Sequence, residues 1–289
     1  MAWTNPAFAA ESSGLTETQC LPCHAPTPLL EQPPKQPLVL RERERGFGVD
    51  CVVCHLDGCQ YVGPYDSWGP HPMRQETARL KSAEFCGECH LMEHQEYTAL
   101  YLPAMEAGHT TPKTCAECHM PACRSRLTQG HVLSLIHPRR TVRDHSFQLW
   151  TDRLIQGAVE LIDLEVHRKS PEEFKASFTL VNRSAGHRIP TGKFGERELR
   201  LQVELLDEGG RVLGSGSRSC FSARTQGLAP EKPTTFSVVV AIPGGQQPAA
   251  VRLVVERVNR DRSFRRTFLT AQRPVAQDGQ ADLGPAPMP

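Results

Sequence analysis

The 289-residue sequence lacks both a strong charge of either sign and long runs of apolar residues. Lysine and arginine total 33 against 32 acidic residues, which leaves a net charge of +1. A balance this close to neutral provides no strong field for nucleic acid or an anionic membrane, so neither is expected as a partner. No apolar run is long enough to span a bilayer, which predicts a soluble protein without a transmembrane segment.

The N-terminus lacks a basic region followed by an apolar stretch, the pattern of an intact secretory signal peptide. It does contain Ala7-Phe8-Ala9 followed by Ala10, which matches the small-x-small end of such a peptide. Residues 1–14 are therefore expected to be either a signal remnant or an arbitrary flexible terminus. The first half of the chain also has little apolar periodicity, and the five prolines within residues 25–37 exclude a helix there.

The sequence is rich in cysteine, and eight of its 11 cysteines fall in four copies of Cys-x-x-Cys-His. In c-type haem attachment each thiol adds to a vinyl group as a thioether, and the histidine is the proximal iron ligand. The pattern therefore predicts a tetrahaem cytochrome c with four covalently attached haem c groups. The copies are Cys20-Leu21-Pro22-Cys23-His24, Cys51-Val52-Val53-Cys54-His55, Cys86-Gly87-Glu88-Cys89-His90 and Cys115-Ala116-Glu117-Cys118-His119.

Two other uses of paired cysteines are structural zinc sites and a disulfide framework. Zinc would take the cysteines two pairs at a time, and its geometry does not require a histidine directly after every second cysteine. Haem attachment accounts for all four histidines, so it is the favoured interpretation. It also predicts maturation outside the cytoplasm, and hence a periplasmic or extracellular protein.

The spacing between motifs predicts the architecture of the N-terminal half. Only 29 to 35 residues separate successive first cysteines, too few for a core around each cofactor, so we expect the haems to pack against one another. Short helices are expected at 16–23, 75–94 and 95–107. From about residue 150 the pattern changes to period-two alternation, which predicts strands. These are 158–167, 174–181, 199–206, 235–242, 251–258 and 264–269.

The expected fold class is therefore α+β and multidomain. A haem-packed tetrahaem domain, built mostly of short helices and loops, should span 15–150. An antiparallel β-sandwich resembling the immunoglobulin fold should span 151–272. A disordered tail rich in Pro, Gly, Ala and Gln should follow at 273–289.

Eight further histidines could close the second axial position of each iron. Candidates are His71, which lies between two prolines, His145, which follows the fourth motif, and His109, six residues before Cys115. His187 lies in a Gly- and Pro-containing loop between two strands, whose tip could carry an imidazole to a haem. His94, one helical turn after His90, is expected to be a surface neighbour rather than a ligand.

Three cysteines lie outside the motifs. Cys59 and Cys123 each follow a proximal histidine by four residues, and in an oxidising compartment we expect them to form a disulfide. Cys220 is expected to be a small buried apolar residue.

The order of the second, third and fourth motifs, with His71 between the second and third, resembles multihaem cytochromes of the cytochrome c-554 type. Val181-Asn182, the Gly-His-x-x-Pro-Thr-Gly run at 186–192, and Arg197 resemble the β domain appended to many of them. The resemblance implies an exported electron carrier with closely stacked haems, and it favours His71, His145 and His187 as distal ligands. Some members form haem-stacked filaments, and others keep one haem five-coordinate.

We accordingly expect electron transfer through four bis-histidine haems, with redox proteins as partners and copies of this chain as a further partner in a filament. The chain is expected to be a carrier rather than an enzyme. The alternative is a haem-dependent oxidoreductase with one open iron acting on a small nitrogen or sulfur compound. No Cys-x-x-Cys-Lys motif is present, so the dedicated nitrite reductase arrangement is not supported.

Overall fold

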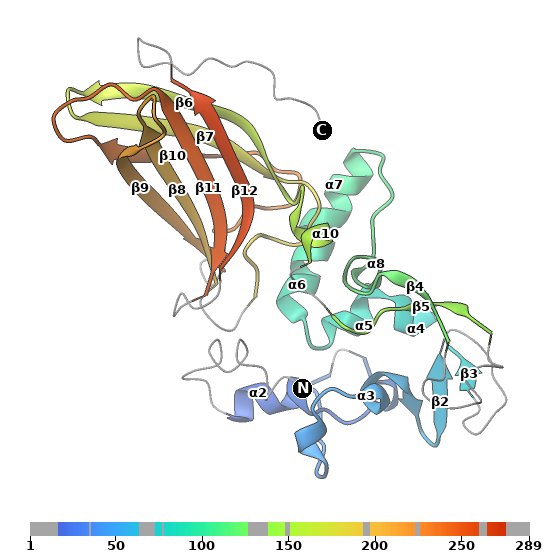
Figure 1. Cartoon of the computed structure of the whole chain (residues 1–289). Helices are drawn as coiled ribbons and strands as arrows, with labels where there is room; N and C mark the ends of the chain where they lie inside the picture. Colours follow the sequence, from blue (N-terminus) through green and yellow to red (C-terminus); the bar gives the residue numbers. More distant parts are fainter. Residues whose placement is uncertain are drawn as a thin grey trace. The chain divides into compact units, whose positions relative to one another are not determined.

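The structure is a computed structural model, and its described residues form two compact units (Figure 1). It describes residues 17–34, 36–63, 73–76, 78–126, 138–147, 151–192, 197–222, 226–259 and 265–275. One unit contains the described residues of 17–95 and 109–151; the other contains those of 96–108 and 152–275. The predicted domain boundaries remain a prediction. Among the described residues, no helix has both the length and the apolar character needed to cross a membrane.

The first unit contains only short helices in its described part. Two of them coincide with Cys-x-x-Cys-His motifs, and a side chain just before the first cysteine caps each one: Asp50 before α3 and Thr114 before α8. The helices are α2 (Glu17–His24), α3 (Cys51–His55), α4 (Ala78–Lys81), α5 (Ala83–Gly87), α6 (Leu91–Glu96) and α8 (Cys115–His119), with 3-10 turns η2 (Leu29–Glu31) and η3 (Arg45–Phe47). The last residue of α6, Glu96, belongs to the second unit.

Short strands lie between these helices. The sheet β1-β2-β3 follows the second motif, and its β2 and β3 strands run parallel. The β4-β5 pair follows the fourth motif and is antiparallel, with Cys123 opposite Val142. The strands are β1 (Leu56–Asp57), β2 (Gln60–Gly63), β3 (Met73–Gln75), β4 (Ala122–Ser125) and β5 (Arg140–Arg143).

The second unit is a β-sandwich of two antiparallel sheets, ordered β10-β7-β6 and β12-β11-β8-β9. Apolar side chains from both sheets form one core, which includes Phe174, Phe178 and Leu253. The strands are β6 (Val159–Ser170), β7 (Glu173–Asn182), β8 (Glu198–Leu206), β9 (Val212–Phe221), β10 (Thr234–Ala241), β11 (Ala250–Val258) and β12 (Arg265–Pro274). Three helical segments join them: the π-helix η4 (Tyr97–Tyr101), α7 (Leu102–Ala107) and α10 (Asp152–Ile155).

The alternation in the sequence accounts for this core. On β8, Leu199, Leu201, Val203 and Leu205 are fully buried, while the residues between them are partly exposed. Side chains two residues apart share a face of a strand, so this pattern places a whole apolar face inward. The expected antiparallel β-sandwich is therefore present. Strand β12 runs through Pro274, so residues 273 and 274 of the expected tail belong to a strand; 276–289 lie outside the described residues.

The expected fold class is wrong. The chain is mostly β, with strands in four sheets, and its described part contains no haem-packed helical domain. The physical reason lies in the segments between motifs. We expected one helix over residues 75–94, but residue 75 is the last residue of β3, and the segment then forms three short helices, α4, α5 and α6. Ser82 starts α5 as its N-cap, because its side chain accepts a hydrogen bond from Phe85 N. Segments after His55 and His119 form strands rather than loops.

Candidate haem-binding site

The cysteines and the histidine of three motifs lie on short helices, α2, α3 and α8. In α3 and α8 the two cysteines stand at i and i+3 and the histidine at i+4, so all three share one helix face. The Asp50 carboxylate accepts a hydrogen bond from Val53 N at 3.3 Å. Thr114 and Glu117 form a reciprocal capping box, with Thr114 N donating to Glu117 Oε2 at 2.7 Å. These caps hold the sulfur atoms and the imidazole in a defined mutual arrangement.

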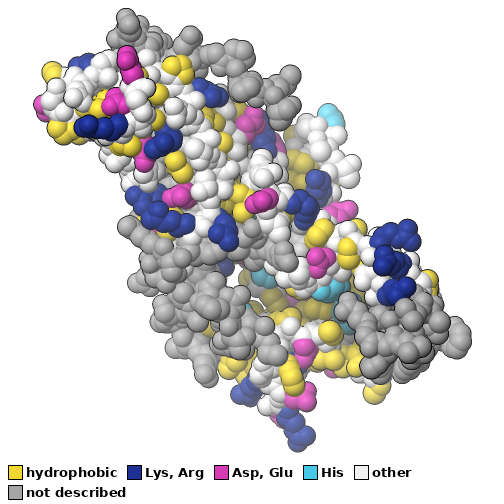
Figure 2. Space-filling model, viewed as in Figure 1, with side chains coloured by type: hydrophobic (Ala, Val, Ile, Leu, Met, Phe, Trp, Pro, Cys, Tyr) yellow, Lys and Arg dark blue, Asp and Glu magenta, His cyan; other side chains and the backbone are white. Residues whose placement is uncertain are grey.

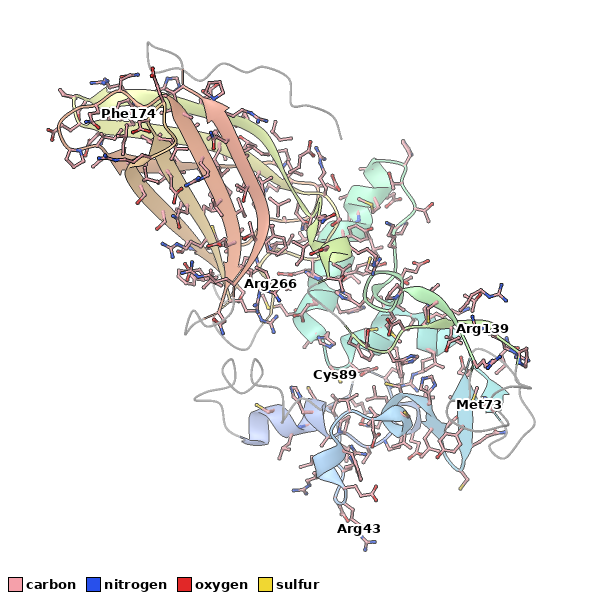
Figure 3. The ribbon with its side chains drawn as sticks, viewed as in Figure 1. Arg43, Met73, Cys89, Arg139, Phe174 and Arg266 are labelled. Atoms are coloured by element: carbon pink, nitrogen blue, oxygen red, sulfur yellow. The ribbon has the colours of Figure 1, made fainter. Side chains whose placement is uncertain are left out.

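The third motif lies against the first and the fourth. The Cys23 and Cys89 thiols form a hydrogen-bonded pair, which lowers the pKa of Cys23 to about 7 and raises the pKa of Cys89. Cys86 and Cys115 form a second such pair, which lowers the pKa of Cys115 to about 7 and raises that of Cys86. Cys54 of the second motif is close enough to raise the pKa of both third-motif thiols further. Figure 3 labels Cys89 within this region.

The first and third motifs are also close at their histidines. Burial lowers the pKa of His24, and the charge of His90 lowers it further. All four motifs therefore gather in one part of this unit, as a chain of closely spaced cofactors requires.

One candidate distal histidine faces a proximal one. The ring centres of His55 and His145 lie 5.9 Å apart, with their planes inclined by 51°. A metal–imidazole bond is about 2 Å and a ring centre lies about 1.1 Å behind its nitrogen, so two imidazoles on opposite sides of a metal have centres about 6 Å apart. The observed separation of the ring centres is close to this value.

Backbone hydrogen bonds leave the same nitrogen of both rings available. His55 Nδ1 lies 2.8 Å from the carbonyl oxygen of Val62, and His145 Nδ1 lies 2.8 Å from that of Arg143. A carbonyl can only accept, so each Nδ1 carries the proton and each Nε2 keeps its lone pair. Metal-bound histidines commonly donate their other ring N–H in this way. The ring centres of Phe147 and His145 lie 6.2 Å apart, with the two ring planes nearly perpendicular.

The loop that carries His187 is held from inside the second unit. Asn182 is fully buried, and its amide nitrogen donates to the carbonyls of His187 at 2.8 Å and Leu228 at 3.3 Å. Its Oδ1 accepts from Ala185 N at 3.0 Å. His187 Nδ1 lies 3.0 Å from the carbonyl oxygen of Arg188, so Nδ1 carries a proton.

The buried carboxylate of Glu96 anchors the same loop. Its Oε2 accepts from Arg188 N at 3.0 Å and from Thr191 Oγ1 at 2.7 Å. Gly186 lies against the Tyr97 and Tyr101 rings, where a Cβ would come within 3.1 Å of Tyr97. Sequence reasoning missed Glu96 because its hydrogen-bond donors are 92 and 95 residues away, and a single acidic residue in a helical segment carries no signal of such a role.

The remaining candidates differ in their surroundings. His109 is exposed in a left-handed backbone conformation between α7 and α8. His71 lies outside the described residues. His94, expected at the surface, is half-buried with its Nε2 inaccessible to solvent, and it packs over Gly87, where a Cβ would lie 2.6 Å from its ring. His94 is therefore partly exposed, and its expected role as a neighbour rather than a ligand stays a prediction.

The expected disulfide is also wrong. Cys59 and Cys123 are exposed free thiols. Cys59 lies in the turn between β1 and β2, whereas Cys123 lies on β4 of a different sheet, so their equal spacing from a histidine does not bring them together. Cys220 is buried, as predicted.

Comparison with known proteins gives a likeness of fold. No family model and no curated protein match the chain. A penta-haem cytochrome c552 from Thermochromatium tepidum matches over 95% of this chain and 92% of that chain, with a TM-score of 0.58 and 14% identity.

Glycosidase matches are much weaker. A β-glucosidase from Thermotoga neapolitana has a TM-score of 0.23, 14% identity, and covers 41% of this chain and 16% of that one. A family 2 glycosyl hydrolase from Bacteroides cellulosilyticus has a TM-score of 0.26, 9% identity, and covers 42% and 15%. Neither carries an argument. The chain is therefore similar in fold to a multihaem cytochrome.

Proposed function

We propose that this protein transfers electrons through four haem c groups attached at the Cys-x-x-Cys-His motifs. The observation that carries the proposal is the His55–His145 pair, whose 5.9 Å separation and backbone-bonded Nδ1 atoms suit two axial ligands of one iron. The fold likeness to a penta-haem cytochrome supports it. When bound, haem iron supplies one-electron chemistry by alternating between the ferric and ferrous states.

The residues of the chain would hold and tune that group. Each motif's two thiols form the thioether links, and its histidine is the proximal ligand. His145 would be the second iron ligand at the second motif, and His187 is proposed as a ligand of another iron. His71 and His109 remain the candidates for the other two positions.

The cellular setting follows from the attachment chemistry. Covalent haem attachment takes place after export, so the protein is proposed to act in the periplasm or outside the cell. Its partners are proposed to be redox proteins, with copies of the chain as a further partner if it assembles into a filament. A single species of monomeric mass on a sizing column would argue against the filament.

Replacement of His145 by alanine tests the proposal. The intact mass of the unaltered protein should exceed that of the 32.1 kDa polypeptide by four haems, and its ferric spectrum should be low-spin. The His145→Ala variant should keep four haems and convert one to a high-spin spectrum, because one iron loses its sixth ligand. His167→Ala is the matched control, since His167 is exposed on β6 beside Glu165 and should have no spectral effect.

A colourless protein, or one without added haem mass, would contradict the proposal. An unaltered spectrum in His145→Ala would remove the assignment of His145. A high-spin haem in the unaltered protein, with turnover of nitrite or hydroxylamine, would instead favour the oxidoreductase.

A further inference from the structure

The β4–β5 hairpin concentrates positive charge that the rest of the chain does not have. Residues 122–143 contain five arginines and no aspartate or glutamate, whereas the other 267 residues contain 28 lysines and arginines against 32 acidic residues. The nearly neutral chain is therefore divided into a basic hairpin and an acidic remainder. We call the five arginines the arginine hairpin: Arg124, Arg126, Arg139, Arg140 and Arg143.

Two of these arginines are exposed to solvent. Arg124 and Arg139 are exposed, and within the described part of the chain no carboxylate forms an ion pair with either. The Arg124 guanidinium donates to the Arg139 carbonyl at 3.4 Å, across the hairpin. Arg143 donates to the Met120 carbonyl at 3.3 Å and lies near the carboxylate of Glu117. Figure 2 shows Lys and Arg side chains gathered over this hairpin, and Figure 3 labels Arg139.

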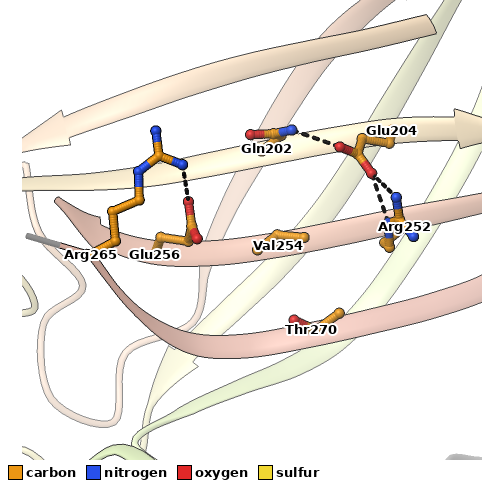
Figure 4. Close-up of a pocket in the computed structure, with 7 residues that line it drawn as sticks. All are labelled: Gln202, Glu204, Arg252, Val254, Glu256, Arg265 and Thr270. Carbon is orange, nitrogen blue, oxygen red and sulfur yellow. Dashed lines mark hydrogen bonds and ion pairs between the residues drawn. The ribbon is translucent and has the colours of Figure 1, made fainter. Parts of the chain in front are cut away.

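Two arginines on the surface of the second unit are neutralised by glutamates. A groove of about 360 Å³ on β8, β11 and β12 contains two arginines, and each has its own glutamate (Figure 4). Arg252 pairs with Glu204, and Arg265 Nη1 lies 3.8 Å from Glu256 Oε2. The groove has no net charge from these four side chains. The arginine hairpin, by contrast, keeps a local excess of positive charge that attracts an anion.

The arginine hairpin is directly joined to the candidate iron site. Strand β5 ends at Arg143, whose carbonyl accepts from His145 Nδ1 at 2.8 Å, and His145 faces His55 at 5.9 Å. A molecule docked on this hairpin therefore lies beside the second motif. The charges that would orient a partner therefore lie beside the histidines that would hold the haem receiving the partner's electron.

We propose that the arginine hairpin is the docking surface for an acidic electron-transfer protein, which exchanges one electron with the haem at the second motif. This inference rests on the proposed function. In the exchange, the partner's reduced centre loses one electron and ferric iron held by His55 and His145 becomes ferrous; no covalent bond forms or breaks. Complementary charge speeds such encounters and makes them sensitive to salt.

The test uses the full-length protein with attached haems and a reduced acidic [2Fe–2S] ferredoxin as the probe. Stopped-flow mixing gives the second-order rate constant for haem reduction at several ionic strengths. The Arg124→Glu/Arg139→Glu variant should react about tenfold or more slowly at low salt, because attraction becomes repulsion, and its salt dependence should be weaker. Arg124→Gln/Arg139→Gln should lie between this variant and the unaltered protein, and it keeps the test available if charge reversal prevents folding.

A matched control separates docking from total charge. Arg43→Glu/Arg211→Glu changes the net charge equally at two exposed arginines elsewhere, and it should keep nearly the unaltered rate. Equal slowing in both double variants, no slowing in either, or no reaction of the unaltered protein with the ferredoxin would overturn the proposal. So would arginine-dependent binding to phosphatidylglycerol vesicles with an unchanged ferredoxin rate, which would assign the hairpin to lipid.

Reduction by dithionite distinguishes a failure of the docking surface from a failure of the proposed electron transfer. If dithionite reduces the haems while the ferredoxin rate does not depend on the arginine hairpin, the docking surface is wrong and electron transfer stands. If dithionite yields no haem reduction at all, the proposed function fails and the docking proposal fails with it.

Discussion

A hydrogen bond to a backbone carbonyl determines which nitrogen of an imidazole carries the proton. His55, His145 and His187 each place Nδ1 within 3.0 Å of a backbone carbonyl oxygen, so each Nδ1 carries a proton. The acceptors belong to three unrelated segments: strand β2, the end of β5, and the loop itself. A shared ring orientation reached by three routes is what a common ligand role would require.

Loss of the Glu96 carboxylate should loosen the loop of His187. In Glu96→Ala, Arg188 N and Thr191 Oγ1 lose a buried acceptor, so we expect a destabilisation of about 1–3 kcal/mol, the cost of leaving such donors unsatisfied. One haem should also gain high-spin character, which absorption and paramagnetic resonance spectra would detect.

The matched control is Glu106→Ala, which removes an exposed carboxylate from α7. Thermal unfolding of both variants gives the comparison. A Glu96→Ala protein as stable as Glu106→Ala would show that the carboxylate does not hold the loop.

The packing of strand β9 depends on two glycines, which have no side chain. Its sequence, VLGSGSRSCF, has no apolar alternation, and it was not among the expected strands. It pairs with β8, while Gly214 and Gly216 face the backbone of β10 in the other sheet. A Cβ on Gly216 would lie 2.6 Å from the Val239 carbonyl oxygen. Glycine therefore allows the two sheets to approach each other along this edge.

Gly216→Ala should destabilise the sandwich, because a backbone oxygen cannot move aside as a flexible side chain can. We expect a cost of about 1–3 kcal/mol, typical of overpacking, measured by chemical denaturation. Gly209→Ala is the control within the same unit, since the nearest atom to its Cβ is a side-chain oxygen of Asp207 at 3.4 Å. Similar midpoints for the two variants would contradict the close approach.

At the scale of the molecule, the third motif lies near each of the other three motifs. Its cysteines contact Cys23 of the first motif and Cys115 of the fourth, and Cys54 of the second lies near both. Under the proposed function, an electron can reach any other motif from the third by one step between neighbours. Electrons would then pass among all four haems of one chain, instead of each haem acting as a separate carrier.

Removal of the third haem should therefore alter its neighbours. The Cys86→Ser/Cys89→Ser variant should carry three haems by mass, and a redox titration should show shifted potentials for the remaining haems, because each loses a nearby charged iron and gains solvent. Cys59→Ser/Cys123→Ser is the control, since these exposed thiols lie outside the motifs and should leave four haems with unchanged potentials. Unshifted potentials in the trihaem protein would show that the motifs are independent.

The sequence by itself determined what depends on near neighbours in the chain. The spacing within Cys-x-x-Cys-His places its three side chains on one helical turn, as in α3 and α8, and period-two alternation places an apolar face on β8 and β11. Both follow from the repeat of a helix or a strand, which a few residues are enough to specify.

Only the tertiary structure decided what depends on contacts between distant segments. His145 faces His55 from 90 residues away, and Cys59 and Cys123 remain apart despite their matching positions. The short strands that follow the second and fourth motifs and the glycine-lined edge of β9 likewise arise from pairing across the fold. Local spacing carries no information about these distances, because the path of the intervening chain sets them.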